Sequence, residues 1–387
     1  MKFFEDGTST VQYLMHKNHK VLECLFSEAY QISEILDVAD EDRVPVGAKK
    51  SGEVSLRLLS QWFNGRSIPA SRPHIETHLM YMNLRTRTDL IQKCLGLSLS
   101  DHYWFMPSNM EPRWEDVNFF DNGFSDDVGD ILIGGYPSPD MEMDYRSPDG
   151  TADGMMPKRW KIIDGRRFLM KGGTGGWQQQ PVNEEIACAI MSRLKINHVP
   201  YHVINVNDRD YYSLCENFVT KETEFISAML VRTFDDTAVS LYDDLIKSCA
   251  ALNIPDPVDS VNKMIALDYI IQNEDRHWGN FGFIRNPDTL KWLGFAPIFD
   301  SGTSLWHDTP FVGEDRPSKT FERCHEKQLE LVTDFSWFDP DSLVGLDREM
   351  EGVFRQTRRM EPSRAKQITD AVAARIKKLE DFAGREY

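Results

Sequence analysis

The chain has 387 residues and a mass of 44.7 kDa, a length at which typical domain sizes predict about two or three packed domains rather than one. Its composition, 41% hydrophobic and 27% charged, is that of a folded protein and excludes a largely disordered chain. The formal net charge of -17 argues against direct binding of nucleic acid or of an anionic membrane, because an acidic surface repels both.

The cysteines and the N-terminal residues indicate where in the cell the protein is expected. The six cysteines lie far apart and form no Cys-x-x-Cys pair, and the first residues carry no secretory signal pattern. No apolar run approaches the roughly 20 residues that a membrane-spanning helix needs. We therefore expect a cytoplasmic protein with reduced thiols and no membrane partner.

The N-terminal third, residues 1–125, is expected to form a separate subdomain. Apolar residues predict short strands at residues 11–15 and 21–26. A helix is predicted over residues 72–81, where Ser71 is a suitable N-cap.

Residues 126–219 are predicted to form a strand-rich lobe. Strands are expected at residues 131–133, 160–163, 166–171, 199–206 and 211–218. Asp164-Gly165 is a typical hairpin turn between the second and third of these strands. A helix is predicted over residues 182–194, because apolar residues recur there at helical spacing.

Residues 220–387 are predicted to be mainly helical. Helices are expected at residues 222–233, 239–252, 258–272 and 362–382. Two short strands, at residues 281–284 and 292–295, flank a turn. The predicted fold class is therefore α+β. It has the two lobes of a protein kinase, a strand-rich N-lobe with an additional N-terminal subdomain and a helical C-lobe.

Three polar residues have the order and spacing of a phosphoryl-transfer site. Asp275 and Asn280 are five residues apart after a predicted helix, the separation between the base and the metal-binding Asn of a protein-kinase catalytic loop. Asp300 follows a predicted hairpin in an Asp-Ser-Gly setting. Carboxylate and amide oxygens suit Mg²⁺, and a carboxylate beside a hydroxyl can act as its base.

Upstream residues supply the other parts that ATP binding needs. Lys171 ends a predicted strand and Glu184 lies at the start of the next helix, an arrangement in which the two side chains pair near the phosphates. The loop from Thr151 to Lys158 includes Gly154, which permits close backbone approach to phosphate oxygens. Backbone groups at residues 215–218 are suited to hydrogen-bond adenine.

These residues together resemble the HipA-like serine/threonine kinases over residues 151–306. The phosphate loop of that family matches Thr151, Gly154, Pro157 and Lys158, and its Asn-Glu pair matches Asn183-Glu184. The Asn-x-Asp-Arg-His-x-x-Asn block is residues 273–280, and the Ala-Pro-x-x-Asp block is residues 296–300.

The resemblance implies a role for each matching residue. Asp275 would be the catalytic base, Asn280 and Asp300 the magnesium ligands, and Lys171 a catalytic residue on the ATP phosphates, with Glu184 as its partner. Thr151, Gly154 and Lys158 would bind the phosphates, and Glu216 and Phe218 would lie at the adenine. The resemblance also makes Thr151 a candidate for autophosphorylation, although Asp153 replaces a glycine of the family loop. The role of His277, either orienting Asp275 or bracing the loop, stays open.

The expected function is ATP- and magnesium-dependent transfer of a phosphoryl group to a protein serine or threonine. The resemblance further implies a toxin whose partner is an antitoxin with a DNA-binding domain. Two alternatives stay open: a kinase for a lipid or small molecule, and a non-catalytic ATP-binding scaffold. No motif identifies the protein substrate or the oligomeric state.

Overall fold

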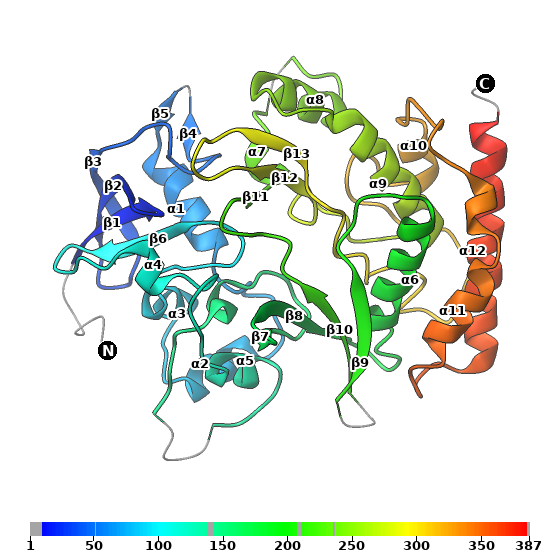
Figure 1. Ribbon diagram of the computed structural model, residues 1–387, viewed down its shortest axis with the longest axis horizontal. Helices are drawn as coiled ribbons and strands as arrows, with labels where there is room; N and C mark the ends of the chain where they lie inside the picture. Colours follow the sequence, from blue (N-terminus) through cyan, green and yellow to red (C-terminus); the bar gives the residue numbers. More distant parts are fainter. Residues whose placement is uncertain (1–9, 51, 138–141, 207–209, 235–236, 385–387) are drawn as a thin grey trace. The chain divides into compact units, whose positions relative to one another are not determined.

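The protein is a mixed α/β chain with a strand-rich N-terminal part and many helices (Figure 1). The computed structural model describes residues 10–50, 52–137, 142–206, 210–234 and 237–384. Two compact units divide the chain. Unit 1 consists of Met1–Leu169, Val219–Ile226 and Arg285–Lys291, and unit 2 of Met170–Phe218, Ser227–Ile284 and Trp292–Tyr387. The three-part division at residues 125 and 219 stays a prediction.

The elements that lie wholly or mainly in unit 1 are mostly strands and short helices. They are β1 (Thr10–His16), β2 (His19–Phe26), β3 (Ile32–Val38), β4 (Lys49–Lys50), β5 (Glu53–Val54), α1 (Leu56–Gly65), α2 (Ile75–Tyr81), α3 (Arg87–Lys93), β6 (Tyr103–Pro107), α4 (Trp114–Val117), α5 (Asp127–Leu132), η1 (Pro148–Thr151), β7 (Lys158–Ile163), β8 (Arg166–Gly172) and β11 (Glu224–Ser227).

The elements of unit 2 are mostly helices. They are α6 (Gln180–Arg193), β9 (Tyr201–Asn205), β10 (Tyr211–Glu216), α7 (Ala228–Val231), α8 (Leu241–Ala251), α9 (Pro257–Ile271), β12 (Gly282–Arg285), β13 (Trp292–Phe295), α10 (His325–Leu329), η2 (Pro340–Leu343), α11 (Leu346–Phe354) and α12 (Pro362–Ala383).

A four-stranded sheet in the order β3-β2-β1-β6 forms the base of unit 1. Its pairs are antiparallel, with Gln12 of β1 opposite Pro107 of β6. One face is closed by aromatic rings. Phe26, Phe63 of α1 and Phe105 meet edge to face with centroids 5.2 to 5.5 Å apart, the geometry that ring quadrupoles favour. This packing gives unit 1 a core of its own.

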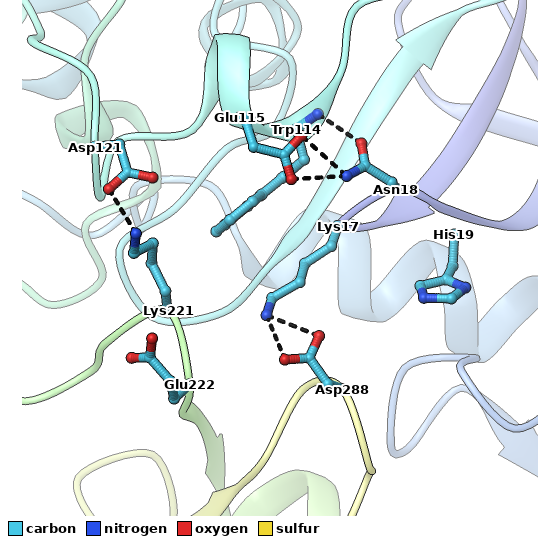
Figure 2. Close-up of a pocket in the computed structure, with 9 residues that line it drawn as sticks. All are labelled: Lys17, Asn18, His19, Trp114, Glu115, Asp121, Lys221, Glu222 and Asp288. Carbon is cyan, nitrogen blue, oxygen red and sulfur yellow. Dashed lines mark hydrogen bonds and ion pairs between the residues drawn. The ribbon is translucent and has the colours of Figure 1, made fainter.

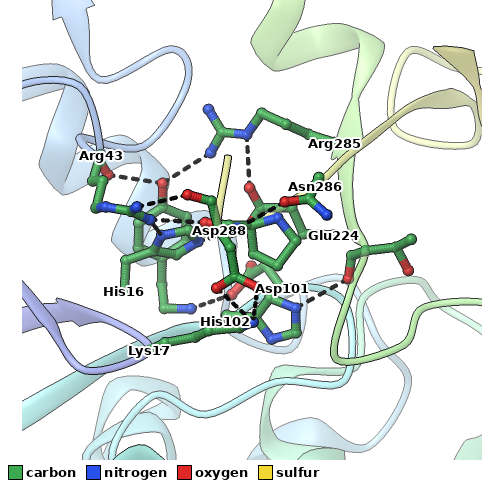
Figure 3. A network of polar contacts seen from close by, with 12 residues as sticks. His16, Lys17, Arg43, Asp101, His102, Glu224, Arg285, Asn286 and Asp288 are labelled. Atoms are coloured by element: carbon green, nitrogen blue, oxygen red, sulfur yellow. Dashed lines mark hydrogen bonds and ion pairs between the residues drawn. The ribbon is translucent and has the colours of Figure 1, made fainter. Parts of the chain in front are cut away.

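Buried polar contacts hold Glu224 and Arg285 in unit 1, although both lie far along the chain (Figure 3). Glu224 has no exposed surface, and its carboxylate contacts His16 Nε2 at 2.9 Å and Arg285 Nε at 2.7 Å. Burial alone would raise the pKa of Glu224, but the hydrogen bond to His16 and the charge of Arg285 outweigh it and lower the pKa to about 2. Glu224 is therefore ionised at neutral pH.

Helix α9 is the centre of unit 2. It starts at Pro257, whose fixed φ suits the first helical position, and ends before Gln272, which adopts the left-handed conformation at φ 52°. Most of its residues from Val261 onward are buried, as expected of a helix inside a core. Helices α6, α8, α10 and α12 contact it. Helix α6 also packs against β9 and β10, which pair antiparallel, and β8 lies next to β10.

Two predictions made for the N-terminal half are wrong. Residues 131–133, predicted as a strand, lie at the end of helix α5 and just beyond it. There Val128, Ile131 and Leu132 are buried at helical spacing, which outweighs the strand preference of isoleucine. The helix predicted from residue 72 starts at Ile75, and its N-cap is His74 rather than Ser71.

The prediction of a helix over residues 222–233 is also wrong. Strand β11 occupies its first half and the single turn α7 its second half. Glu224 and Ile226 are buried alternately with more exposed neighbours, which is the strand period of two. The ion pairs of Glu224 explain why a carboxylate is tolerated at a buried position of this strand.

Two further observations concern the whole described chain. Among the residues that the structure describes, no helix is both long and apolar enough to cross a bilayer. The six cysteines are free thiols, five of them buried.

Candidate active site

Lys171, Glu184 and Asp300 form a buried charge cluster in unit 2. Lys171 near the end of β8 is 2% exposed, and its Nζ lies 2.7 Å from Glu184 Oε1 of α6 and 2.5 Å from Asp300 Oδ1. Burial alone would lower the pKa of Lys171, but Asp300 and Glu184 outweigh it and raise the pKa. Burial raises the pKa of Glu184, and Lys171 opposes that shift. The lysine therefore stays charged between two carboxylates.

The backbone around Asp300 is held in an unusual conformation. Asp300 has φ 57°, in the left-handed region that non-glycine residues rarely adopt. The next amide, Ser301 N, donates to Glu184 Oε2 at 2.8 Å. Both oxygens of Glu184 are thus used, one on Lys171 and one on the segment that carries Asp300. Backbone strain of this kind is common where a side chain must be aimed at a ligand.

Arg276 joins the Asp275 loop to the Asp300 segment. Its guanidinium is fully buried and pairs with both carboxylate oxygens of Asp268 on α9 at 3.0 Å. It also donates to Phe299 O at 2.5 Å and to Asn280 O at 3.0 Å. Burial alone would lower the pKa of Arg276, but Asp268 raises it. One side chain therefore connects α9, the loop and the residue before Asp300.

Asp275 and Asn280 lie together on this loop. Asn280 Nδ2 donates to the backbone oxygen of Asp275 at 2.9 Å, so its carbonyl oxygen is the atom left for a cation. The Asp275 carboxylate is partly exposed and pairs with Lys319 at 2.5 Å. His277 Nδ1 accepts from Gly279 N at 3.0 Å, which identifies a bracing contact for the histidine inside the loop.

The loop from Thr151 to Lys158 lies in unit 1 and is held by two cations. Arg72, which is 3% exposed, donates to Gly154 O at 2.9 Å and to Ala152 O at 2.5 Å. Lys158 Nζ donates to Asp153 O at 2.5 Å. Thr151 Oγ1 lies 3.1 Å from Leu97 O and 3.0 Å from Pro148 O. The structure therefore brings Gly154 and Lys158 together.

The backbone conformation at position 154 explains why this residue is a glycine. Its φ is 96°, and a Cβ there would lie 2.4 Å from Lys158 Nζ. A side chain would be strained by the backbone and would displace the lysine end. A glycine is therefore needed for the lysine to reach the loop carbonyl.

The predicted adenine residues lie at the end of β10 and just after it. Glu216 is exposed at the end of the strand. The ring of Phe218 stacks on Phe299 with centroids 5.5 Å apart and planes 29° apart. Phe299 precedes Asp300, so an aromatic pair adjoins the segment that carries the charge cluster.

A second acidic cluster is neutralised within unit 2. Glu274, His307 and Asp308 have ligand atoms within 4.8 Å of one another. Arg316 pairs with Glu274 at 2.6 Å and with Asp308 at 2.7 Å, so both carboxylates already have a cationic partner. We assign this cluster a structural role.

A surface cavity of about 340 Å³ lies in unit 1 and contains none of the predicted site residues (Figure 2). Its two lysines are already paired, Lys17 with Asp288 at 2.8 Å and Lys221 with Asp121 at 3.0 Å. Four carboxylates and two ammonium groups line it, and each ammonium group is held by one of the carboxylates. We assign no ligand to this cavity.

Several residues of the site were not assigned roles from the sequence. Arg72, Asp268 and Lys319 contact predicted residues, and none of them has a local motif that reveals the contact. Asp268 is the one with a usable signal. It is a carboxylate with apolar residues on both sides in the second half of α9, and a buried charge requires a partner.

Comparison with known proteins identifies the family. The model of the HipA-like C-terminal domain matches residues 151–378, more than half of the chain. HipA in a Shewanella oneidensis MR-1 toxin–antitoxin complex with HipB and operator DNA is similar in fold, with a TM-score of 0.58 and 13% identity over 95% of this chain and 97% of that chain. The Helicobacter pylori proinflammatory kinase CtkA matches with a TM-score of 0.45 and 14% identity over 59% of this chain and 94% of that chain.

No curated protein sequence matches this chain. The match that defines the family therefore rests on the domain model, and it covers both the loop that begins at Thr151 and the segment that carries Asp300. The protein belongs to the family with a HipA-like C-terminal domain.

Proposed function

We propose that the protein is an ATP- and magnesium-dependent kinase that phosphorylates serine or threonine hydroxyl groups of a protein. The observation that carries the proposal is the buried cluster of Lys171 with Glu184 and Asp300. A cation placed between a helical carboxylate and a second acid is the arrangement that kinases use to hold nucleotide phosphates near a metal. Membership of the HipA-like family supports the same reading.

Lys171 would bind the phosphates of ATP without leaving its carboxylates. An ammonium group has three N–H donors, and two of them are used on Glu184 and Asp300. The third remains for a phosphate oxygen. The loop that contains Gly154 and Lys158 would contribute backbone amides, and the Phe218–Phe299 pair would offer an apolar wall to adenine.

Asn280 and Asp300 fit a magnesium ion by their chemistry. One offers an amide oxygen and the other a carboxylate, the hard oxygen ligands that Mg²⁺ prefers. When bound, the ion would neutralise charge on the phosphate oxygens. The strained backbone at Asp300 supports this role, because it aims the carboxylate into the cluster.

Asp275 would act on the acceptor hydroxyl. Its carboxylate would accept the hydroxyl hydrogen bond and take the proton as the oxygen bonds to the γ-phosphorus. The bond from that phosphorus to the bridging oxygen breaks, and the electron pair leaves with ADP. Arg276 holds this loop beside the Asp300 segment by donating to Phe299 O.

Thr151 is proposed as a site of regulation by autophosphorylation. Its hydroxyl now faces two backbone carbonyls, those of Leu97 and Pro148. A phosphate would remove the donated hydrogen and bring nearly two negative charges against these oxygens. The loop would have to leave its place, and ATP binding would weaken. Phosphopeptide mapping after incubation with Mg²⁺ and ATP tests this step, and unmodified peptide from Ser147 to Lys158 would contradict it.

The partner is proposed to be an antitoxin that carries the DNA-binding domain. The HipA of Shewanella oneidensis occurs in a complex with HipB and operator DNA. With a net charge of -17, this chain is unsuited to bind DNA directly. A mobility shift of operator DNA by the pair, and none by this chain alone, is the expected result. We propose a cytoplasmic location, in keeping with free thiols.

The test uses γ-labelled ATP in an extract, with wild type and Asp275→Ala compared. Label on proteins that requires Asp275 supports the proposal. Label on a lipid or small metabolite alone would support the other kinase class. Binding of ATP by both proteins without transfer by either would support a non-catalytic scaffold.

A further inference from the structure

Lys319 is fixed beside Asp275 by the fold of its own segment, residues 317–324. Pro317 and Cys324 form an antiparallel bridge, and Ser318 N donates to Arg323 O at 3.0 Å. Inside this short hairpin, Ser318 and Thr320 are 3% and 2% exposed, whereas the side chain of Lys319 between them is 56% exposed. Ser318 and Thr320 are therefore turned into the protein, whereas Lys319 between them is turned outward, on the side of Asp275.

Buried contacts hold this hairpin against the Asp275 loop. Thr320 Oγ1 donates to Arg276 O, the carbonyl next to Asp275 in the chain. The ring of Phe321 meets Trp278 edge to face at 5.4 Å, and Phe321 N donates to Gln328 Oε1 at 2.9 Å. These contacts fix the backbone that carries Lys319, and the ion pair with Asp275 holds its ammonium.

The contact of Lys319 with Asp275 leaves the ammonium close to the reacting atoms. A hydroxyl that donates to Asp275 lies about 2.6–3.2 Å from the carboxylate. Because Lys319 Nζ lies 2.5 Å from Asp275 Oδ1, it is no more than about 6 Å from a hydroxyl oxygen that donates to Oδ1, and no more than about 8 Å from one that donates to Oδ2. Lys171 and Arg276 are already bound to other carboxylates of unit 2.

We propose that Lys319 is a further catalytic residue, whose ammonium contacts the phosphoryl group as it passes to the acceptor oxygen beside Asp275. The inference rests on the proposed kinase function. Lys319 transfers no proton: the acceptor proton goes to Asp275, and the electron pair of the broken bond leaves with ADP. The ammonium instead balances negative charge on the transferred oxygens, where positioned donors have their largest effect.

A plain surface ion pair is the alternative. Both side chains are partly exposed, and such pairs contribute little to stability. Under that alternative Lys319 would be replaceable without loss of turnover. Under the proposal, charge at this position is needed in the transition state, so a change lowers kcat and leaves KM for ATP nearly constant.

The experiment measures ADP release by the full-length protein with Mg²⁺ and ATP, for wild type, Lys319→Met and Lys319→Arg. We expect Lys319→Met to lower kcat on the order of 100-fold, and Lys319→Arg to recover most of that loss. The matched control is Lys366→Met, which removes an exposed lysine paired with Asp370 on α12 and should leave kcat unchanged. Thermal unfolding of each variant verifies that it folds.

Three results overturn the inference while the kinase function stands. The first is a Lys319→Met protein that is as active as an active wild type. The second is a more active variant, which would show that Lys319 blocks Asp275. The third is a rise in KM for ATP with kcat unchanged. If wild type releases no ADP above Asp275→Ala, the proposed function itself fails, and that outcome is separate from these three.

Discussion

Arg276→Met tests the role of Arg276 as the connection between the catalytic loop and the Asp300 segment. The variant removes a fully buried guanidinium and leaves Asp268, itself 2% exposed, without its cationic partner, while the Asn273 amide still donates to it. It also leaves the carbonyls of Asn280 and Phe299 without this donor. Breaking a buried ion pair from one side costs about 3–5 kcal/mol, because an uncompensated charge stays in the interior.

The expected shift follows from that free energy. For a domain of about 150–250 residues, 1 kcal/mol changes Tm by about 2–4 °C, so Arg276→Met should lower Tm by roughly 6–20 °C. Arg276→Lys keeps the charge but loses the two-pronged contact with Asp268, and its Tm should lie between the two.

Thermal unfolding followed by circular dichroism, without nucleotide, gives the measurement. The control is Arg355→Met, because Arg355 is 78% exposed and pairs with Glu351 on the surface of α11. Its Tm should equal that of wild type. A Tm of Arg276→Met within about 2 °C of wild type would refute the structural role, since that shift is worth only about 1 kcal/mol or less.

Three further predictions concern unit 1. Arg72→Met should raise KM for ATP by about 10- to 100-fold in an ADP-release assay, because two loop carbonyls lose their donor, whereas the exposed Arg85→Met should not. Burial raises the pKa of Asp149 to about 7, so stability should fall as the pH rises from about 4 to about 7, and Asp149→Asn should remove that slope from the Tm profile. The pH dependence that Glu224 contributes has the opposite sign, because its pKa is lowered to about 2. Stability should fall as the pH drops from about 4.5 toward 2, and it should fall less in Glu224→Gln. An Arg72→Met protein with the KM of wild type would contradict the role of Arg72 in holding the loop. A pH dependence of Tm that is unchanged in Asp149→Asn or Glu224→Gln would contradict the pKa shift of that residue.

Local spacing allowed the central part of the site to be predicted. Asp275 and Asn280 lie on one short loop, so a separation of five residues was enough to bring the Asn280 amide to the Asp275 carbonyl. Lys171 and Glu184 come from a strand and the next helix, and such neighbours in sequence are usually neighbours in space. Their assignment as functional residues remains a proposal.

The residues that were missed make contacts over long separations. Arg72 reaches a loop about 80 residues later, and Lys319 reaches a carboxylate 44 residues earlier. Such contacts depend on how whole segments pack, which periodicity and capping signals do not encode.

The misassigned elements have a related cause. The helix expected over residues 222–233 contains Glu224, whose partners are His16 and Arg285. Those partners lie more than 200 residues earlier and about 60 residues later, so no local window includes them. The segment forms a strand because Glu224 makes tertiary ion pairs and its residues are alternately buried. Both effects outweigh a weak local preference for helix.

The most direct test of the kinase assignment is ADP release from ATP by purified protein with Mg²⁺, compared between wild type and Asp275→Ala, with ATP affinity measured in parallel. We predict that Asp275→Ala binds ATP like wild type and turns it over at least on the order of 100- to 1000-fold more slowly. Equal turnover by the two proteins, at any level, would contradict the assignment of Asp275 as the base and with it the proposed function.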